Sequence, residues 1–476
     1  MLLASLAKPQ SSKGSRKVCL SALLLALSLI GSGQVWLKPI APGLTYRMEV
    51  DLETPRVIHA LRLSLDAPTT ANTELAGLKV YSEPTGKGRE TLGDLIKRTG
   101  AIAGINGDFF PFTGDPLGLM VRNGELVSRV LPSRAAFGWG GKHASGSMPN
   151  GDLAIRLQQG SYQLDGLNQE CGVNELMLNL EAAGDAVAEK GPVSHAIIAL
   201  SQPAKASPRG GLRGYVVEVK RDLPRLAVGE GLAILTGSGS KAAIVNSLTP
   251  GEEVVASIET GGFDWSKVRQ VIGGGPFLVR DGKVQVDWER QGFKADFALK
   301  RNPRTAVGAT ADGDLWFVAL DGRQAISDGA TLEEMARIMI SLGCREAINL
   351  DGGGSTTINA GGLTLNRPSD GQQRLIANAV LFYGSAPKDA APLNLNLPES
   401  VAAGDTIMLK VFDAEGKPVP TNEVIWTAQG KAWVDQGGAL RGIAEGDSWV
   451  FAYVRGQVLS GVVSVKEQAP PTPLRR

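Results

Sequence analysis

The pattern of apolar and polar positions predicts two regions of different architecture. Between residues 45 and 384, apolar runs of strand length are mixed with stretches in which apolar residues recur every three or four positions. Strands are expected at 56–65, 101–105, 315–320 and 347–350. The mixture predicts an α+β or mixed α/β domain in which helices pack on a mixed β-sheet.

Two helices are predicted from the residues that cap their amino ends. Thr91 and Asp94 form one capping pair. Thr331 and Glu334 form the other, and the apolar stripe that follows ends at Gly343, a residue type that often terminates helices. With the apolar runs on either side, the second helix is expected to be part of a strand–helix–strand unit.

A Pro- and Ala-rich linker at 385–392 separates this domain from a region with a β-only pattern. Residues 393–467 contain five short strand-like runs with turn signals between them, which favours a small all-β sandwich that folds independently. The region resembles bacterial immunoglobulin-like domains, with Trp426 as the expected core residue. The Pro-rich tail at 468–476 is expected to be disordered.

Residues 1–33 have the pattern of an export signal. Lys13, Arg16 and Lys17 precede an apolar run at 18–30, which is the order of charge and apolar residues in secretory signals. Because the uncharged stretch continues beyond this run, to about the 20 residues that a membrane span needs, an uncleaved anchor is the alternative. We therefore expect a protein that works outside the cytoplasm, whether periplasmic, secreted or tethered to the membrane by this segment.

Charge balance and the scarcity of histidine exclude several functions. The 49 Lys and Arg residues nearly match the 48 Asp and Glu residues, and a net charge of +1 argues against nucleic acid as a partner. The three histidines, His59, His143 and His195, lie far apart and away from cysteine, which argues against a zinc hydrolase. They are expected in loops or at the surface. We expect no metal or other cofactor, and acids and bases drawn from Asp and Glu.

The cysteine count excludes a scaffold held together by several disulfides. Cys19 lies in the N-terminal apolar segment, which leaves Cys171 and Cys344 for the folded protein. Two buried free thiols are expected, since free cysteine is among the most often buried residues. One long-range disulfide between them is the alternative that the sequence leaves open.

Polar turns that contain glycine follow four of the apolar runs. They begin at Asn106 (NGDFF), Gly273 (GGGP), Asp321 (DGR) and Asp351 (DGGGS). If the strands before the last two turns are parallel neighbours, a right-handed crossover places both turns at the same sheet edge, where sites in open α/β sheets gather. Arg323 and Asp351 are then expected in one cleft.

Two features of these motifs suggest an anion-binding site. In DGGGS, three glycines allow backbone angles at which successive N–H groups point inward as an anion nest, with Asp351 and Ser355 on either side. Arg304 and Arg323 can each offer two parallel hydrogen bonds to the same anion. The alternatives are a tight hairpin without chemistry and two surface or ion-paired arginines.

The order of the motifs points to a family. NGDFF, GGGP, NPRTAVGATADGDLWFVALDGR, LGCREAINLDGGGSTT and NRPSD follow one another along the chain, and this series resembles the phosphodiester glycosidase family over roughly residues 50–384. The resemblance implies that residues 45–384 form the catalytic domain of an exported hydrolase. Such an enzyme releases a sugar from a phosphodiester joined to its anomeric carbon.

The resemblance also implies the site residues. Asp351, Asp321 and Asn106 are expected at the catalytic centre. The expected substrate-binding residues are Arg304, Thr305, Arg323, Gly352, Gly353, Gly354, Ser355, Ser369 and Asp370. Relatives commonly have glycine at the position of Asp108, so this residue is not counted as a general catalyst.

The chemistry of the implied reaction fits these residue types. Cleavage of C1–O releases a phosphate monoester, which is stable as an anion and needs little acid assistance. Arginines and backbone N–H groups hold the phosphate, while a carboxylate supports positive charge at C1 as nucleophile, base or electrostatic partner. Asp321, Asp370 and Glu175 are the candidates for a second carboxylate beside Asp351.

Two other functions are compatible with the motifs. One is an envelope protein that binds glycans or assembles exopolysaccharide without turnover, although the presence of both Arg304 and Asp351 favours the enzyme. The other is a phosphodiesterase that breaks P–O in place of C–O. In each case the expected partner is a glycan or a sugar-1-phosphodiester, with cell-envelope polysaccharide as its source.

Overall fold

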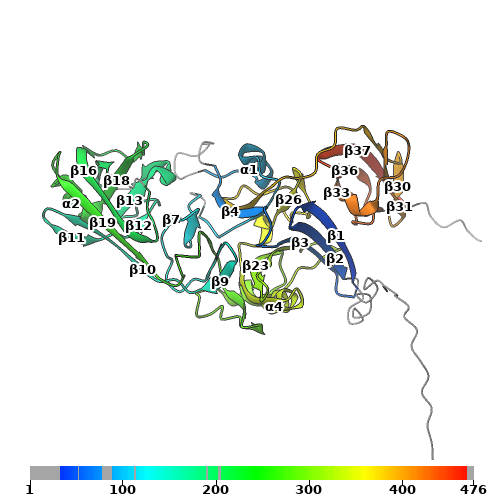
Figure 1. Cartoon of the computed structure of the whole chain (residues 1–476), viewed down its shortest axis with the longest axis horizontal. Helices are drawn as coiled ribbons and strands as arrows, with labels where there is room; N and C mark the ends of the chain where they lie inside the picture. Colours follow the sequence, from blue (N-terminus) through cyan, green and yellow to red (C-terminus); the bar gives the residue numbers. More distant parts are fainter. Residues whose placement is uncertain are drawn as a thin grey trace, which may run out of the picture.

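The computed structural model describes residues 33–468, except 52, 78–87, 112–113, 189–190 and 202–204. The predicted export segment and the predicted disordered tail lie almost entirely outside the described residues. Within the described part, no helix is both long enough and apolar enough to span a membrane. Figure 1 shows a sheet at the left, a central body, and a small β domain at the right.

The central body is built on an eight-stranded sheet in which all neighbouring strands are antiparallel. In spatial order its strands are β1 (Gln34–Ala41), β2 (Leu44–Asp51), β3 (Arg56–Leu63), β24 (Leu315–Leu320), β23 (Arg304–Thr310), β25 (Cys344–Asn349), β21 (Phe277–Arg280) and β22 (Lys283–Val284). Strand β24 is apolar and buried at every position because both of its faces are covered. Leu332, Met335 and Met339 of helix α4 (Leu332–Ser341) contribute to the core on one face.

Two five-stranded sheets pack with the central sheet. In spatial order, one contains β7 (Glu125–Ser128), β6 (Met120–Arg122), β20 (Gln270–Gly273), β8 (Ala136–Gly140) and β9 (His143–Ser147), and the other contains β27 (Leu363–Thr364), β26 (Ile358–Ala360), β5 (Ala103–Asn106), β28 (Asn378–Tyr383) and β4 (Thr70–Leu75). Edge-to-face contacts of Phe317 with Trp139 and with Phe382 join the three sheets, at centroid distances of 5.9 and 5.1 Å. This shared core holds β5, which carries Asn106, against the central sheet.

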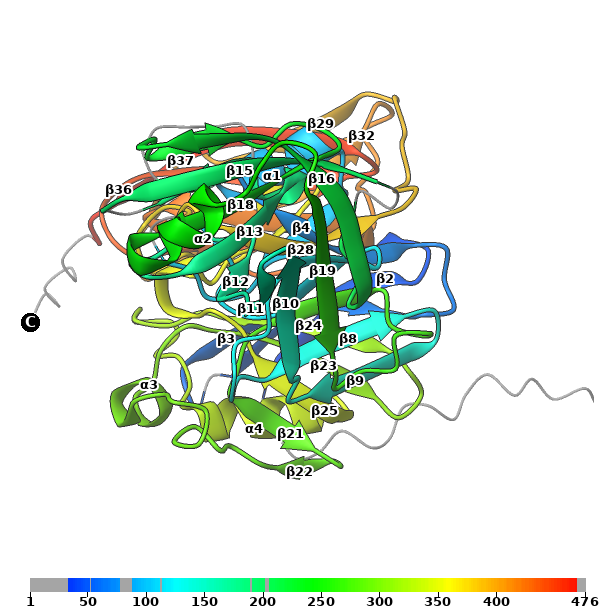
Figure 2. The same ribbon diagram turned by 90° about the vertical axis from the view of Figure 1, so that its left-hand side faces the viewer.

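A second eight-stranded sheet, called the distal sheet here, occupies the left of Figure 1 and faces the viewer in Figure 2. In spatial order it contains β11 (Gly160–Gln163), β10 (Gly151–Leu157), β19 (Glu253–Thr260), β16 (Arg209–Arg221), β15 (Val193–Leu200), β18 (Leu232–Ser238), β13 (Leu176–Leu180) and β12 (Gly166–Leu167); a two-stranded sheet of β14 (Asp185–Val187) and β17 (Arg225–Ala227) is separate from it. The Pro and Gly residues of 201–213 predict a surface loop, but β16 already begins at Arg209.

The fold is mostly β, so the predicted α+β or mixed α/β class is only partly confirmed. Strands hold 50% of the residues and helices 10%. The described α-helices are α1 (Leu92–Thr99), α2 (Ala242–Asn246), α3 (Ala295–Leu299) and α4 (Leu332–Ser341). Both predicted caps are present: Thr91 accepts a hydrogen bond from the Asp94 N–H, and Thr331 and Glu334 form a complete capping box. The difference arises mainly from 151–260, where alternating burial along β10 and β19 builds a sheet.

Strands β24 and β25 are not adjacent, as a simple strand–helix–strand unit would require. Strand β23 lies between them and is antiparallel to both, so β24 and β25 run in the same direction. Their carboxyl ends therefore reach the same edge of the sheet, as predicted, but across an intervening strand. The amino ends of β23 and β21 reach this edge as well.

The C-terminal domain consists of short strands, as the sequence pattern predicts. A four-stranded sheet contains β30 (Ser400–Ala402), β37 (Gln457–Lys466), β36 (Gly446–Val454) and β33 (Val424–Gly430); a three-stranded sheet contains β31 (Thr406–Met408), β35 (Ala439–Gly442) and β34 (Ala432–Val434); and β29 (Leu393–Asn396) pairs with β32 (Lys410–Asp413). Trp426 is buried in the core of this domain, as expected. The immunoglobulin-like assignment and the domain boundaries stay predictions.

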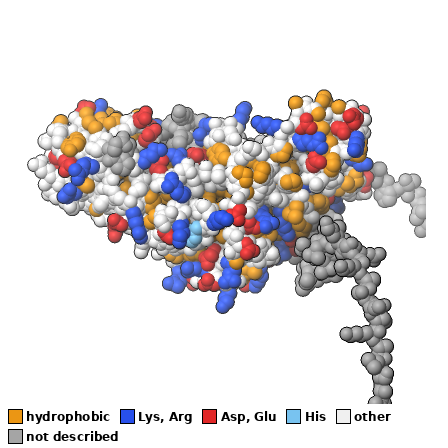
Figure 3. Space-filling model, viewed as in Figure 1, with side chains coloured by type: hydrophobic (Ala, Val, Ile, Leu, Met, Phe, Trp, Pro, Cys, Tyr) orange, Lys and Arg blue, Asp and Glu red, His pale blue; other side chains and the backbone are white. Residues whose placement is uncertain are grey.

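This domain is docked on the central body. Ile425 of β33 belongs to the same buried cluster as the central sheet. Arg367 donates hydrogen bonds to the carbonyl oxygens of Ala432 and Gly430, at 2.9 and 3.0 Å. The Thr427 hydroxyl donates to a backbone carbonyl of β27 at 2.7 Å. Figure 3 shows apolar side chains on this domain, and charged side chains of both signs over the same face of the molecule.

Two histidines are buried, so their expected surface location is wrong. His59 on β3 has its Nδ1 atom 2.7 Å from the Tyr46 hydroxyl, and its Nε2 atom lies 3.5 Å from an Asp321 carboxylate oxygen. The ring nitrogens of His195 on β15 lie 2.9 Å from a threonine hydroxyl and 2.9 Å from a backbone carbonyl oxygen. Both rings are tolerated inside because they find polar partners there. Cys171 and Cys344 are buried free thiols, which confirms the expectation.

Candidate active site

Polar turns from distant parts of the chain meet at one edge of the central sheet. The carboxyl ends of β24 and β25 lead into Asp321 and Asp351, and the amino end of β23 brings Arg304 to the same edge. Strand β5, from a different sheet, ends at Asn106. The Asp351 N–H donates to the Gly107 carbonyl oxygen at 3.0 Å, which ties the two sheets together at this point.

Asn106 holds the loop that carries Asp351. Its buried side chain donates to the Asp351 carbonyl oxygen at 2.7 Å. Its amide oxygen accepts from the Thr305 hydroxyl at 2.8 Å and from the Thr357 N–H at 3.1 Å. Because these bonds go to protein groups, the geometry favours a positioning role for Asn106 and Thr305 over the direct roles expected from the resemblance.

Asp351 is a partly exposed carboxyl group at this edge. Burial raises its pKa from 3.8 to about 6, and the Ser355 hydroxyl, Arg374 and the Gly352 N–H offset this only in part. The Ser355 Oγ lies near enough to affect the carboxyl, yet it completes no hydrogen bond within the described residues. A carboxyl that titrates this close to neutral pH suits a base or a nucleophile.

A second carboxyl group, that of Asp108, is buried two residues after Asn106. Its oxygens accept backbone N–H groups at 2.8 and 2.7 Å. Burial nevertheless raises its pKa to about 7, and the charge of Asp351 adds to the rise while Arg134 opposes it. A Cβ atom at Gly273 would lie 2.4 Å from Asp108 Oδ2, so the first glycine of GGGP makes room for this carboxyl group.

The two carboxyl groups interact. The charge of Asp351 raises the pKa of Asp108, and burial raises the pKa of both groups, to about 6 for Asp351 and about 7 for Asp108. Neighbouring carboxyl groups that titrate near neutral pH can act as a base and an acid.

Arg134 supplies a positive charge near Asp108. Its guanidinium carbon lies 3.9 Å from the centroid of the Phe293 ring and 5.5 Å from that of Phe109. The charge of Arg134 lowers the pKa of Asp108, and burial lowers the pKa of Arg134 itself. The two aromatic rings therefore hold a partly desolvated cation close to the buried carboxyl group.

Arg304 is a brace for the sheet edge. It is buried, and its guanidinium donates to the carbonyl oxygens of Ala330, Phe297 and Lys300 at 2.8, 2.7 and 2.9 Å. Burial, with the nearby charge of Arg323, lowers the pKa of Arg304 to about 10. The expected clamp on phosphate is not formed, because these bonds tie the guanidinium to the backbone around α3 and to the segment before α4.

Two other arginines flank the glycine loop. A Cβ atom at Gly353 would meet the Arg323 Nη2 atom at 3.3 Å, and one at Gly354 would meet the Arg374 Nη2 atom at 2.1 Å. Both arginines are exposed. The charge of Arg374 also lowers the pKa of Asp351. Arg323 and Arg374 are therefore the guanidinium groups best placed to meet an anion at this loop.

The glycines of the loop allow close packing, and they do not form the expected anion nest. The N–H groups of Gly353 and Ser355 are already bonded, to the carbonyl oxygens of Pro303 and Gly352 at 2.9 and 3.2 Å. Gly353 has a left-handed φ of 60°. A Cβ atom at Gly354 would collide with side chains on the loop surface. The missing side chains thus admit the flanking arginines, while bonded N–H groups stabilise the turn.

Asp321, an expected catalytic residue, is fully buried. Its carboxylate accepts from the Arg367 N–H at 3.1 Å and from the Asn366 side chain at 3.2 Å. It also lies 3.5 Å from the His59 ring. These partners join β24 to the NRPSD loop, so the geometry favours a structural role for Asp321.

The other candidate carboxylates are engaged elsewhere. Asp370 accepts from Arg374 at 2.7 and 3.1 Å, next to Ser369. Glu175 accepts the Gly172 N–H at 2.8 Å, in the turn before β13 of the distal sheet. The structure thus brings Asp370 and Ser369 to the rim of the site and leaves Glu175 in the distal part of the chain.

Sequence reasoning passed over three residues of this site. Asp108 lies inside the NGDFF motif, where its position after a strand end was a usable signal. Arg374 follows Asp370 by four positions, a spacing that often pairs charges. No local sequence pattern marks Arg134, because only its packing on the two phenylalanine rings places it near Asp108.

These features define a mainly β protein with two carboxyl groups of raised pKa and exposed arginines at one sheet edge. Residues 206–383 match the family model of the phosphodiester glycosidases. Over these residues the match confirms the resemblance that the order of the motifs predicts. The match begins beyond Asn106 and Asp108, which only the tertiary structure joins to it.

Curated relatives match over short stretches. The chain is 34% identical to N-acetylglucosamine-1-phosphodiester alpha-N-acetylglucosaminidase of Mus musculus over 111 residues, which is 21% of this chain and 21% of the relative. It is 36% identical to the SPbeta prophage-derived uncharacterized protein YomE of Bacillus subtilis (strain 168) over 115 residues, which is 24% of this chain and 17% of the relative. The chain thus spans about a fifth of the length of these relatives.

Two solved structures share the fold over most of the chain. A hypothetical protein from Synechocystis has a TM-score of 0.59 at 18% identity, and the match covers 73% of this chain and 64% of that one. A putative exported protein from Burkholderia pseudomallei has a TM-score of 0.58 at 18% identity, with 74% of this chain and 96% of that one covered. At this level of identity the comparison concerns the fold alone.

Proposed function

We propose that the protein is an exported hydrolase that cleaves the glycosidic C1–O bond of sugar-1-phosphodiesters in envelope or extracellular glycans. The observation that carries the proposal is the pair of carboxyl groups at the sheet edge, Asp351 and Asp108, with pKa values of about 6 and about 7. Exposed arginines beside Asp351 supply the positive charge that a phosphodiester requires. The family match supports the reaction class.

Asp351 acts at the anomeric carbon in this scheme. As a carboxylate it attacks C1 or stabilises the positive charge that develops there as C1–O lengthens. The electron pair of that bond leaves with the phosphate oxygen, and water supplies the hydroxyl group that ends on C1. Asp108 keeps a proton near Asp351 at neutral pH, which limits the negative charge of the site and provides its acid.

Arg323 and Arg374 are the proposed phosphate ligands. The Arg323 guanidinium donates to the Asn302 side chain at 2.9 and 3.2 Å. Arg374 donates to Asp370 at 2.7 and 3.1 Å. Each guanidinium is thus oriented before substrate binds, which reduces the entropy lost on binding.

An extracytoplasmic location follows from the export pattern of residues 1–33, which would act as a cleaved signal or as a membrane tether. A structural relative described as a putative exported protein is compatible with this location. There the enzyme would meet cell-envelope polysaccharide, the source of phosphodiester-linked sugars that we propose. The alternative function, glycan binding or exopolysaccharide assembly without turnover, shares the location and is separated from hydrolysis by assay.

Hydrolysis of a sugar-1-phosphodiester in ¹⁸O-labelled water tests which bond is cut. The expected result is label in the free sugar and none in the phosphate monoester. Label in the phosphate would establish P–O cleavage and a phosphodiesterase. If no member of a panel of sugar-1-phosphodiesters is hydrolysed, the non-catalytic alternative is favoured.

The pH dependence of kcat/KM should form a narrow bell. Activity should rise as Asp351 ionises at about pH 6 and fall as Asp108 loses its proton at about pH 7. In Asp108→Asn the alkaline limb should vanish, since the amide has no proton to lose, and the acid limb should stay. An alkaline limb that persists in this variant would belong to another group.

The same carboxyl groups should make stability depend on pH. Their folded pKa values exceed the ordinary 3.8, so the folded protein binds more protons than the unfolded chain between about pH 4 and pH 7. Their contribution to stability is complete below about pH 4 and is lost as pH rises through about 6 and 7. Asp108→Asn should flatten this decline by up to roughly 4 kcal/mol, at about 1.36 kcal/mol per pKa unit. Urea unfolding of both proteins at acid and alkaline pH measures the difference, and parallel profiles would contradict it.

Arg323→Met should lower kcat/KM for a sugar phosphodiester by roughly ten- to a hundredfold, the loss expected for one or two charge-assisted hydrogen bonds. An aryl glycoside without phosphate should lose much less, because it makes no contact with this arginine in the proposed complex. Arg337→Met, which removes an exposed arginine of α4, is the matched control. Equal losses for both substrates would show that Arg323 supports the loop and does not bind phosphate.

A further inference from the structure

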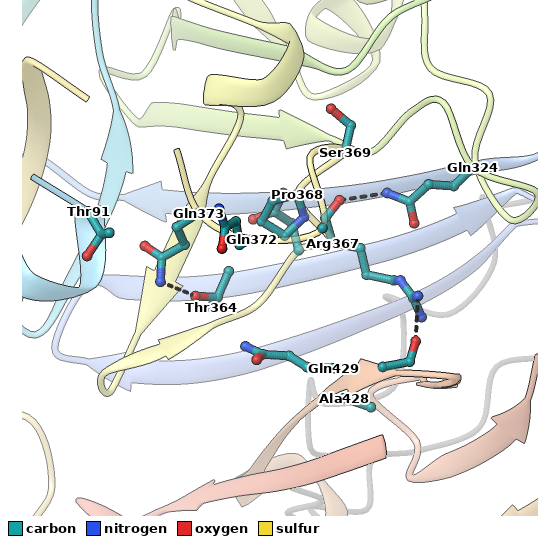
Figure 4. Close-up of a pocket in the computed structure, with 13 residues that line it drawn as sticks. Thr91, Gln324, Thr364, Arg367, Pro368, Ser369, Gln372, Gln373, Ala428 and Gln429 are labelled. Atoms are coloured by element: carbon teal, nitrogen blue, oxygen red, sulfur yellow. Dashed lines mark hydrogen bonds between the residues drawn. The ribbon is translucent and has the colours of Figure 1, made fainter. Parts of the chain in front are cut away.

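A polar cavity lies between the rim of the site and the C-terminal domain (Figure 4). Its volume is about 570 Å³, within the range of small-molecule binding sites. One wall is the segment from Thr364 to Gln373, which contains the NRPSD loop. The other is the end of β33, from Ala428 to Gly430. The cavity therefore exists only because the C-terminal domain is docked.

The lining offers hydrogen bonds but no available charge. Glutamine amides and threonine and serine hydroxyls belong to its lining. Among the described residues that line it, Arg367 alone has a charged side chain. Its guanidinium is already bonded to two carbonyl oxygens of the C-terminal domain, those of Gly430 and Ala432. A cationic ligand would therefore meet no negative charge here, and an anion would compete with the two carbonyl oxygens for the N–H groups of Arg367.

The glutamines of the cavity fall into two groups. The Gln324 amide donates to the Arg367 carbonyl oxygen at 2.7 Å, and the Gln373 amide donates to the Thr364 hydroxyl at 2.8 Å (Figure 4). Gln372 and Gln429 are exposed, one on each wall, and their amides make no hydrogen bond within the described residues. A free amide presents both donors and an acceptor, which matches the paired donor and acceptor of a sugar hydroxyl.

Two residues that line the cavity are chain neighbours of residues at the proposed phosphate site. Gln324 lines it and directly follows Arg323 in the chain. Ser369 lines it as well and directly precedes Asp370, which holds Arg374 in place. A glycan joined to a phosphodiester between the two arginines would thus be led into the space between the domains.

We propose that this cavity binds a neutral oligosaccharide segment of the substrate, and that the C-terminal domain forms one wall of the binding site. The inference rests on the proposed function, which supplies the sugar phosphodiester to which the segment is attached. Gln372 and Gln429 contact its hydroxyl groups from opposite sides. Pro368 and Ala428 offer apolar surface to the C–H faces of its rings. The enzyme would then be selective for polymer-borne phosphodiesters.

Calorimetric titration of the full chain with phosphate-free hexasaccharides of glucose, mannose, galactose and N-acetylglucosamine tests the proposal. At least one of these neutral probes should bind, and the double variant Gln372→Ala, Gln429→Ala should weaken its binding roughly tenfold or more, as the loss of two hydrogen bonds predicts. Gln163→Ala, an exposed glutamine of β11 in the distal sheet, should bind as the parent does. Both altered side chains are exposed, so the melting temperature should stay close to that of the parent and report correct folding.

Several results would overturn the proposal. They are the failure of all four neutral probes to bind, undiminished binding by the double variant, or tighter binding of an oligogalacturonate of equal length. Because the probes contain no phosphodiester, their binding does not depend on turnover. Binding that requires both glutamines in a protein that hydrolyses no sugar phosphodiester would uphold the cavity and reject the proposed function. Hydrolysis of small substrates without any binding of the neutral probes would do the reverse.

Discussion

Asp351→Asn should lower kcat for a sugar-1-phosphodiester by roughly a thousandfold or more, a large acid–base or nucleophilic contribution. The variant keeps the size of the side chain and removes the charge that acts at C1. Its melting temperature at alkaline pH should equal or slightly exceed that of the parent, because the raised pKa of Asp351 means that ionisation costs the folded state free energy. Initial rates and thermal melts of the same preparation measure both effects.

Asp321→Asn is the informative comparison for this experiment. Asp321 is buried and bonded to Arg367 and Asn366, so its replacement should lower the melting temperature. Any activity lost should then follow from lower stability. Wild-type rates for Asp351→Asn, or an equal fall in melting temperature for both variants, would reject Asp351 as the catalytic carboxylate.

Arg304→Lys should destabilise the protein strongly. The buried arginine makes three hydrogen bonds to carbonyl oxygens, at 2.7 to 2.9 Å, and the shorter ammonium group cannot reproduce this fork. Loss of two charge-assisted bonds costs roughly 3–6 kcal/mol. At about 2–4 °C per kcal/mol, the melting temperature should fall by roughly 6 °C or more. Differential scanning calorimetry measures the change.

The effect of Arg304→Lys on activity should be independent of phosphate. Below the melting temperature, kcat/KM for a sugar phosphodiester and for an aryl glycoside should fall by the same factor, since the brace acts on the whole sheet edge. Arg337→Lys, at an exposed position of α4, should change neither stability nor activity. A loss confined to the phosphodiester, with an unchanged melting temperature, would restore Arg304 as a phosphate clamp.

Local patterns predicted much of the fold because their causes lie within a few residues. The capping box of Thr331 and Glu334 and the stop at Gly343 bound α4 as expected, since each depends on hydrogen bonds inside one turn. The strand-like runs beyond residue 392 also became strands, as their local pattern predicts. The scarcity of helices was not predicted, because short apolar runs fit a buried strand and a helix equally until their neighbours are known.

The candidate site was predicted in position and only partly in composition. Motifs at strand ends marked Asp351 and the NGDFF turn. Antiparallel pairing through β23 brought Asp321 and Asp351 to one edge, and the hydrogen bond from the Asp351 N–H to the Gly107 carbonyl oxygen joins the NGDFF turn of another sheet to it. Asp108 was passed over because glycine at this position in relatives suggested that the side chain is dispensable. Its raised pKa comes from burial against Gly273, which lies far along the chain, and from the charge of Asp351.

The sequence by itself determined where α4 begins and ends, the resemblance to the phosphodiester glycosidases and the carboxylate that follows β25. Only the tertiary structure decided which arginine is buried and which is exposed: Arg304 is buried among carbonyl oxygens, whereas Arg323 and Arg374 lie exposed beside the glycine loop. It also decided that Asp108 holds its proton near neutral pH. Hydrogen bonding and desolvation are set by groups that folding brings together from distant parts of the chain, and no local pattern records them.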